Sequence, residues 1–284
     1  YMYWNKDLFE QAGLDPESPP QNFEEWAEYA YKITDYDSNT YGSGIFMSYG
    51  NHQMSLMGID GGWAVSETDD GKWLVNIENN EGYKDYLTWM KSIYENGDNP
   101  IENEIDSMFI AGQIGIMVNG PWLAAGADEA DINYGMGKIF GNEPRGDVAG
   151  FFVTNSASDE EKLACERFMQ WWYTGNEGTD VAETGAGVWS LKIGFPTAYI
   201  PLAEDVSYTS NEKLSNLALD SNSKESLWST TDPDFKGWAE TNGAIGTMTE
   251  SIVFGASIDE ALTAAQAEVE KIVITYEGED SLAK

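Results

Sequence analysis

A tryptophan follows a short hydrophobic segment, residues 115–118, that is typical of a β-strand. The connecting residues are Asn119, Gly120 and Pro121, and the Gly-Pro pair turns the chain so that Trp122 projects from the rim at the strand's end. Such rims are where open α/β sheets bind ligands. A flat indole can stack on the C–H face of a sugar ring while fixed polar groups bind its hydroxyls. With eleven Trp, the chain has ample rings for such a site.

Oxygen-bearing side chains also alternate along an acidic turn, where they would suit calcium. Asp35, Asp37 and Asn39 stand two residues apart, and Tyr41 could offer its carbonyl, as in the first half of a calcium loop. The twelfth position is Phe46, where an EF-hand requires a glutamate. A full EF-hand is therefore excluded, and the plainer interpretation is an acidic turn after a helix.

Residues suited to catalysis are few. His52 is the single histidine, so any Ser–His or Cys–His nucleophile would depend on it, and no second His or Cys stands at metal-ligand spacing. The single cysteine, Cys165, lies in a helical pattern and is expected to be a small buried apolar residue. Glycosidases need a pair of carboxylates. Because the chain has 49 acidic residues, pairs can be found anywhere in it, and their presence does not indicate a glycosidase. We therefore expect no cofactor and no metal.

The charge balance excludes two classes of partner. The chain has 15 Lys and Arg against 49 Asp and Glu, a formal net charge of -34. It would repel phosphate backbones and anionic lipids, so neither nucleic-acid binding nor electrostatic membrane attachment is expected. No apolar run approaches the roughly eighteen residues that a membrane-spanning helix needs. The length of 284 residues exceeds the size at which one core usually divides, so two lobes are expected.

The elements that must position these residues alternate between helix and strand. Helices marked by a capping residue or by an apolar stripe are expected at residues 22–33, 83–94, 158–172 and 257–273. Strands are expected at 115–118, at 150–154 and, around a tight turn, at 64–66 and 73–77. The apolar stripes, including Trp171 and Trp172, are expected in the core. This alternation predicts an α/β layer architecture.

Five short segments form an ordered set that spans nearly the whole chain. They are YWNKDLF at 3–9 with AGL at 12–14 and PPQNFEEW at 19–26, FIAGQIGIMVNGPW at 109–122, residues 150–165, GFPT at 194–197, and SIDEAL at 257–262. In this order they resemble the family 1 extracellular solute-binding proteins, and within them the sugar-binding branch to which maltodextrin-binding proteins belong.

The resemblance implies a periplasmic-binding-protein-like type II fold, with two lobes joined by hinge crossings and the first lobe incomplete in this chain. It assigns residues 1–150 to the first part of the C-terminal lobe, 151–199 to the returning segment of the N-terminal lobe, and 200–284 to the second part of the C-terminal lobe. Tyr3 falls just beyond the first crossing, so a full-length member would carry about 110 further residues before it. The helix that bears Trp171 and Trp172 is then expected in a separate or displaced unit.

The resemblance also implies a ligand site. Its contacts correspond to the stacking position Trp122, the loop residues Tyr49, Asn51 and His52, the late positions Trp238 and Asn242, and Phe151 with Phe152 at the second crossing. For these two phenylalanines, hinge packing and ligand contact are both open.

The function implied is that of the substrate-binding component of an ABC importer, which captures a sugar or oligosaccharide without converting it. The implied partners are the carbohydrate and the permease subunits. The implied location is extracellular, as a monomer that is either a lipid-anchored lipoprotein or periplasmic. The alternatives are a receptor for another small solute, such as a polyamine, and a carbohydrate-active hydrolase.

Overall fold

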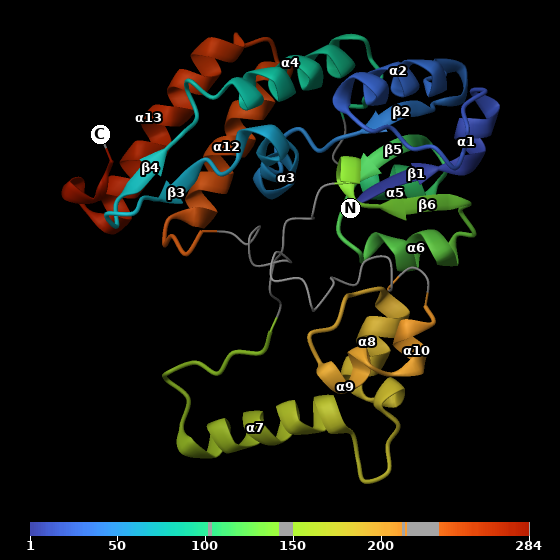
Figure 1. The fold of residues 1–284 in the computed structure, drawn as a ribbon, viewed down its shortest axis with the longest axis vertical. Coiled ribbons are helices and arrows are strands. Elements are labelled where there is room, and N and C mark those ends of the chain that lie inside the picture. Colours follow the sequence, from blue (N-terminus) through green and yellow to red (C-terminus); the bar gives the residue numbers. More distant parts are fainter. Residues whose placement is uncertain (102–103, 142–149, 212–213, 215–232, 284) are drawn as a thin grey trace.

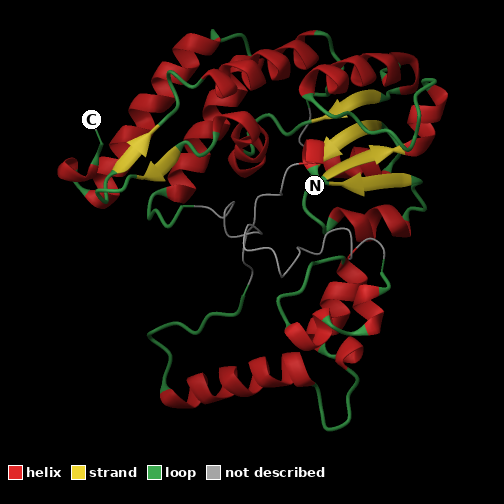
Figure 2. Ribbon diagram, viewed as in Figure 1, coloured by secondary structure: helices red, strands yellow, loops and turns green. Residues whose placement is uncertain are grey.

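The computed structural model describes residues 1–101, 104–141, 150–211, 214 and 233–283. A mixed four-stranded sheet of order β2-β5-β1-β6 lies at one end of the molecule (Figure 1, Figure 2). Its strands are β1 (Met2–Asn5), β2 (Tyr41–Gly44), β5 (Ile114–Val118) and β6 (Tyr134–Gly137). β1 is antiparallel to β5 and β6, whereas β2 and β5 run parallel. The predicted α/β class is thus confirmed.

Four helices pack around this sheet: α1 (Lys6–Gln11), α2 (Phe23–Ile33), α5 (Ile105–Ile110) and α6 (Leu123–Glu129). α2 begins where the sequence predicts, because the Asn22 side chain accepts a hydrogen bond of 2.8 Å from the Glu25 N–H. Trp26, Ala30 and Ile33 then recur at helical spacing and are buried. The cap and the apolar stripe together set the helix against the sheet.

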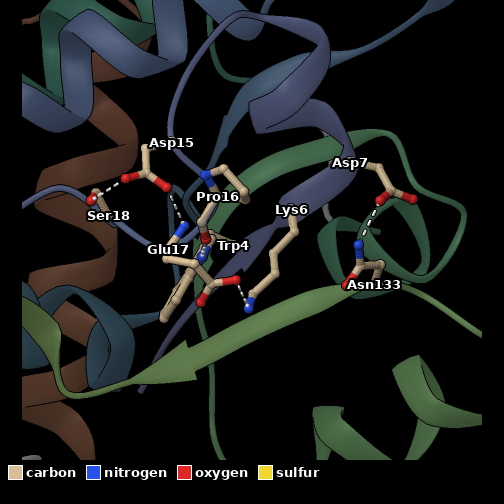
Figure 3. Close-up of polar contacts among 8 residues, drawn as sticks. All are labelled: Trp4, Lys6, Asp7, Asp15, Pro16, Glu17, Ser18 and Asn133. Atoms are coloured by element: carbon tan, nitrogen blue, oxygen red, sulfur yellow. Dashed lines mark hydrogen bonds and ion pairs between the residues drawn. The ribbon is translucent and has the colours of Figure 1, made fainter.

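Figure 3 shows polar contacts that connect β1 and the start of α1 to the following turn. The indole N–H of Trp4 donates to the carbonyl of Pro16 at 2.8 Å, and the ammonium of Lys6 lies 2.6 Å from a carboxylate oxygen of Glu17. Asp15 in turn accepts the backbone N–H of Glu17 at 3.0 Å. The buried Trp4 ring therefore gains a partner for its polar edge, whereas the Lys6–Glu17 pair, open to water, contributes little stability.

A second group of elements lies beside the sheet. It comprises α3 (Gly50–Gly61), α4 (Glu81–Glu95), α12 (Trp238–Val253), α13 (Ile258–Glu277) and the hairpin of β3 (Val65–Glu67) and β4 (Trp73–Val75). The hairpin and the start of α13 confirm their predictions, since Gly71 has φ +76° at the turn and Ser257 caps the Glu260 N–H. One hydrophobic core includes Phe9 and Trp26 from the first group and Val273 from α13. Residues far apart in sequence thus form one folded body.

A third group extends away from the other two (Figure 1). It comprises α7 (Asp159–Thr174), η3 (Val181–Glu183), α8 (Gly185–Ile193), α9 (Ile200–Ala203) and α10 (Val206–Thr209). Leu202 and Tyr208 form a small buried cluster with Val181 and Tyr199, so residues on both sides of position 200 pack together. The lobe boundary expected at residue 200 stays a prediction. The remaining short helices are η1 (Tyr36–Ser38), η2 (Ile139–Gly141) and η5 (Glu279–Ser281).

Three expectations about this third group are wrong: a strand at 150–154, a buried apolar stripe on α7, and a buried Cys165, which is only half-buried. Residues 150–154 form no strand, because no strand of the described chain pairs with them, and Phe151 instead packs its ring on Phe168 and Trp172. α7 has the predicted Ser158 capping box, yet none of its residues is buried, and Trp171 is 48% exposed. Its apolar stripe packs against α8 and otherwise borders a groove of about 310 Å³. None of the described helices is both long and apolar enough to cross a bilayer.

Candidate functional site

The start of α3 is pressed against α12. Tyr49 is the N-cap residue of α3, is 50% exposed, and makes no side-chain cap for the helix. The next residue, Gly50, lies so close to α12 that an added Cβ would overlap the carbonyl oxygen of Asn242. Asn51 is half-buried and His52 is buried. The structure therefore brings the loop residues expected in the site together with Asn242, almost two hundred positions later.

His52 is enclosed at this junction without a partner for one ring nitrogen. It is 6% exposed, its ring centroid lies 5.2 Å from that of Phe46, and its Nε2 atom makes no hydrogen bond. Burial away from water lowers the pKa of His52 from 6.5 to about 3. His52 is therefore an uncharged imidazole at neutral pH.

We expect this burial to make stability depend on pH. The unfolded chain binds a proton at His52 near pH 6.5, whereas the folded chain stays neutral until about pH 3, so folding loses free energy as the pH falls below 6.5. Relative to His52→Gln, the unsubstituted chain should lose about 2 kcal/mol of unfolding free energy between about pH 7 and about pH 5. Urea unfolding of both chains at the two pH values measures this. A difference that does not change with pH would contradict a buried neutral imidazole.

The first turns of α12 supply the other side of the junction. Asn242 donates through Nδ2 to the Trp238 carbonyl at 3.1 Å, while its buried Oδ1 has no hydrogen-bond partner. The hydroxyl of Thr241, a fully buried residue, also lacks a partner. Trp238 is half-buried and meets Trp63 edge-on, with ring centroids 5.5 Å apart. Of the late positions named by the resemblance, Asn242 thus lies beside the start of α3, whereas Trp238 meets Trp63 just beyond the end of α3.

Three residues at this junction were missed by sequence reasoning. From the sequence alone, Phe46 was considered only as the residue that excludes an EF-hand, and Trp63 was not considered. Thr241 carries no motif. It lies within the buried stripe that continues through Ile245, so periodicity could have located it but could not have shown an unpaired hydroxyl. That shortage of hydrogen bonds is visible only in three dimensions.

Trp122 is the N-cap residue of α6 and is 46% exposed. Its ring stacks on Phe195 at a centroid distance of 5.7 Å, rather than on a ring of the α3 start. Phe151 and Phe152 are 44% and 85% exposed and line the groove along α7. The structure therefore brings Tyr49, Asn51 and His52 to Asn242, and Trp238 lies one turn earlier on the helix of Asn242. The Trp122 ring packs on Phe195, and Phe151 and Phe152 border the groove along α7. Ligand contact by any of them stays a prediction.

The acidic turn folds around its own hydrogen bonds. Asp35 accepts the Asp37 N–H at 3.0 Å through one carboxylate oxygen and the Ser38 hydroxyl at 2.9 Å through the other. Asn39 takes a left-handed conformation with φ +54°, and the Tyr41 hydroxyl approaches its side-chain oxygen at 3.5 Å. Within the described chain, no group of three or more His, Cys, Asp or Glu is placed to hold a metal ion. This geometry adds nothing to the calcium interpretation.

Comparisons with known proteins identify a family and individual relatives of this chain. The family described as "Bacterial extracellular solute-binding protein" matches residues 1–193. The galactooligosaccharide-binding protein of Bacillus subtilis (strain 168) is 26% identical over an alignment of 180 residues, which covers 58% of this chain and 41% of that protein. The chain thus spans well under half of that relative's length. Both the family and this relative are binding proteins.

Two solved structures share the fold. The cyclic alpha-maltosyl-1,6-maltose binding protein of Arthrobacter globiformis has a TM-score of 0.63 at 19% identity, covering 96% of this chain and 70% of that one. An ABC transporter solute-binding protein of Thermotoga lettingae TMO, bound with alpha-D-tagatose, has a TM-score of 0.66 at 18% identity, covering 96% and 69%. These likenesses confirm the predicted type II fold. Since the family also matches more than half of the sequence, the chain belongs to the bacterial extracellular solute-binding proteins.

Proposed function

We propose that this chain captures an uncharged sugar or oligosaccharide, without converting it, for the permease subunits of an ABC importer. It works as a monomer outside the cytoplasmic membrane, either as a lipid-anchored lipoprotein or in a periplasm. The names of its relatives support this proposal, since they bind galactooligosaccharide and a cyclic maltosyl-maltose, and one was solved with tagatose. Membership of an extracellular family supports the location.

The observation that carries the proposal is a set of unpaired polar atoms where α3 meets α12. Among the described residues, five buried side-chain atoms lack a hydrogen-bond partner, and three of them belong to His52, Thr241 and Asn242. Buried polar atoms are nearly always paired, and leaving one unpaired costs about 1–3 kcal/mol. Sugar hydroxyls both donate and accept, so they can pair with an imidazole nitrogen, a hydroxyl and an amide oxygen alike.

The neighbouring side chains favour a neutral ligand with apolar faces. Tyr49 stands exposed at the start of α3, and Trp63 and Trp238 pair just beyond its end; such rings stack on the C–H face of a sugar. His52 is uncharged at neutral pH because burial lowers its pKa to about 3. A polyamine would instead require carboxylates enclosed with the rings.

Isothermal titration calorimetry against β-1,4-galactotriose, maltotriose, tagatose and spermidine tests the proposal. The titrations extend to millimolar ligand, because the chain corresponds to only part of its relatives. We expect stoichiometric binding of at least one saccharide with no release of reducing sugar on incubation. Release of reducing sugar would favour a hydrolase, whereas heat from spermidine alone would favour a receptor for cations.

Asn242→Ala should weaken saccharide binding by about tenfold. The substitution removes the unpaired Oδ1 acceptor, and one hydrogen bond within a binding site is worth about 1–1.5 kcal/mol. Asn176→Ala is the matched control, since Asn176 is exposed on the third group of elements and should bind as the unsubstituted chain does. Equal affinities for the two variants would contradict a ligand contact at Asn242.

A further inference from the structure

Three aromatic rings form a continuous stack where the end of α8 meets the start of α6. Phe195 is the middle ring, with its centroid 5.7 Å from that of Trp122 and 5.2 Å from that of Trp189. The interplanar angles are 30° and 27°, which is the stacked geometry that aromatic pairs favour. Trp122 and Trp189 remain 46% and 47% exposed, while Phe195 is half-buried between them.

The backbone around Phe195 holds its ring in this position. The Ser190 hydroxyl donates to the Phe195 carbonyl at 2.5 Å. Gly194 ends α8 in the left-handed conformation, with φ +89°, and turns the chain toward α6. A Cβ on Gly194 would lie 3.1 Å from the carbonyl oxygen of Pro121, so the two turns are in direct contact. Phe195 therefore reaches Trp122 from an anchored turn.

Part of the Trp122 ring is already in contact with the protein. Its six-membered ring lies against Gly120, where an added Cβ would overlap it, and Phe195 stacks on it as well. A sugar ring would need the same kind of face-to-face contact that Phe195 makes. We propose that Phe195 is an affinity- and specificity-determining residue, because its ring competes with the saccharide for the face of Trp122. This inference rests on the proposed function and on the prediction from the sequence that Trp122 stacks on the ligand.

The competition has a direct thermodynamic consequence. Trp122 accepts a sugar ring only in the fraction of molecules whose aromatic stack is open, so the apparent affinity is reduced by that fraction. A stacked aromatic pair corresponds to a factor of about 2 to 10 in an equilibrium constant. Ligands whose sugar ring must stack on the Trp122 indole bind with this reduced apparent affinity. Ligands that are held by hydrogen bonds alone do not lose affinity in this way. Phe195 thus selects against ligands that depend on stacking.

Phe195→Ala tests the competition by calorimetric titration with β-1,4-galactotriose. We expect a dissociation constant about 2- to 10-fold smaller than that of the unsubstituted chain. Phe195→Leu, which keeps apolar volume but not a flat ring, should shift in the same direction and protects the test against a folding defect. In the Trp122→Ala background the gain from Phe195→Ala should disappear, because a double-mutant cycle isolates the coupling between the two rings.

Tyr173→Ala is the control, since Tyr173 lies in the same group of elements and its ring meets Tyr199 rather than Trp122. It should bind as the unsubstituted chain does. If the unsubstituted chain binds but both Phe195 variants bind equally or more weakly, the competition is refuted and the proposed function stands. A gain that survives in the Trp122→Ala background refutes it too. If no chain binds galactotriose, maltotriose or tagatose, both proposals fall.

Discussion

Gly50→Ala is expected to lower the free energy of unfolding by about 3 kcal/mol and to weaken saccharide binding by about tenfold or more. Gly50 is the first residue of α3, and a Cβ there would overlap the carbonyl oxygen of Asn242 on α12. Because the clash is with backbone rather than with a flexible side chain, the two helices must move apart. That movement separates His52 from Asn242, and with them the unpaired atoms proposed to bind sugar.

The same helix provides a matched control. Gly58→Ala places the same Cβ where nothing lies within 4 Å. Since Gly58 lies inside the helix, alanine should stabilise the chain by about 0.5–1 kcal/mol and leave binding unchanged. Urea unfolding and calorimetric titration of both variants measure the two effects. Equal stabilities for the two alanine variants would show that α3 and α12 are not in backbone contact at Gly50.

Trp26→Ala is expected to cost about 3–5 kcal/mol of unfolding free energy, because it removes a fully buried aromatic side chain. The Trp26 ring lies 5.4 Å from that of Trp89 and 6.2 Å from that of Phe140. Its indole N–H also donates to the buried hydroxyl of Ser43 at 3.1 Å, which would lose that partner. Helix α2 would then be poorly held on β2.

Tyr31→Ala, on the same helix, is the control. It separates the effect of removing a buried side chain from the effect of changing the helix propensity of the residue. Tyr31 is 72% exposed, so its removal should change the unfolding free energy by no more than about 0.5 kcal/mol. Denaturant unfolding followed by circular dichroism measures both variants. If Trp26→Ala unfolds at the same denaturant concentration as Tyr31→Ala, the packing of α2 on the sheet is not as described.

Local sequence signals predicted an element correctly where the interaction that defines it involves only neighbouring residues. The Asn22 and Ser257 caps predicted the starts of α2 and α13, and the Asp70-Gly71 turn predicted the hairpin of β3 and β4. In each case the deciding interaction spans only a few residues, so the sequence contains it whole. The apolar stripe of α2 was also buried as predicted, since its partner strand β2 follows closely in the chain.

Two predictions that depended on a partner distant in the sequence were wrong. Residues 150–154 have a strand-like pattern, but a strand exists only where another pairs with it, and none of the described strands does. The stripe on α7 has the same periodicity as the one on α2, yet Leu163 and Trp171 remain about half-exposed. The spacing of apolar residues shows which side chains share one face of a helix. It does not show which other element packs against that face.

For the candidate site, too, some features were determined by the sequence and others only by the tertiary structure. By itself the sequence determined the fold class, the family and the residue types suited to a neutral sugar, because those are properties of local pattern and of ordered motifs. Only the tertiary structure decided that Gly50 meets Asn242, that His52 is buried and neutral, and that Phe195 stacks on Trp122. Gly50 and Asn242 are distant in the chain and meet because α3 and α12 pack around a shared core. Phe195 and Trp122 meet because the turn after α8 contacts the turn before α6, and no local propensity contains either contact.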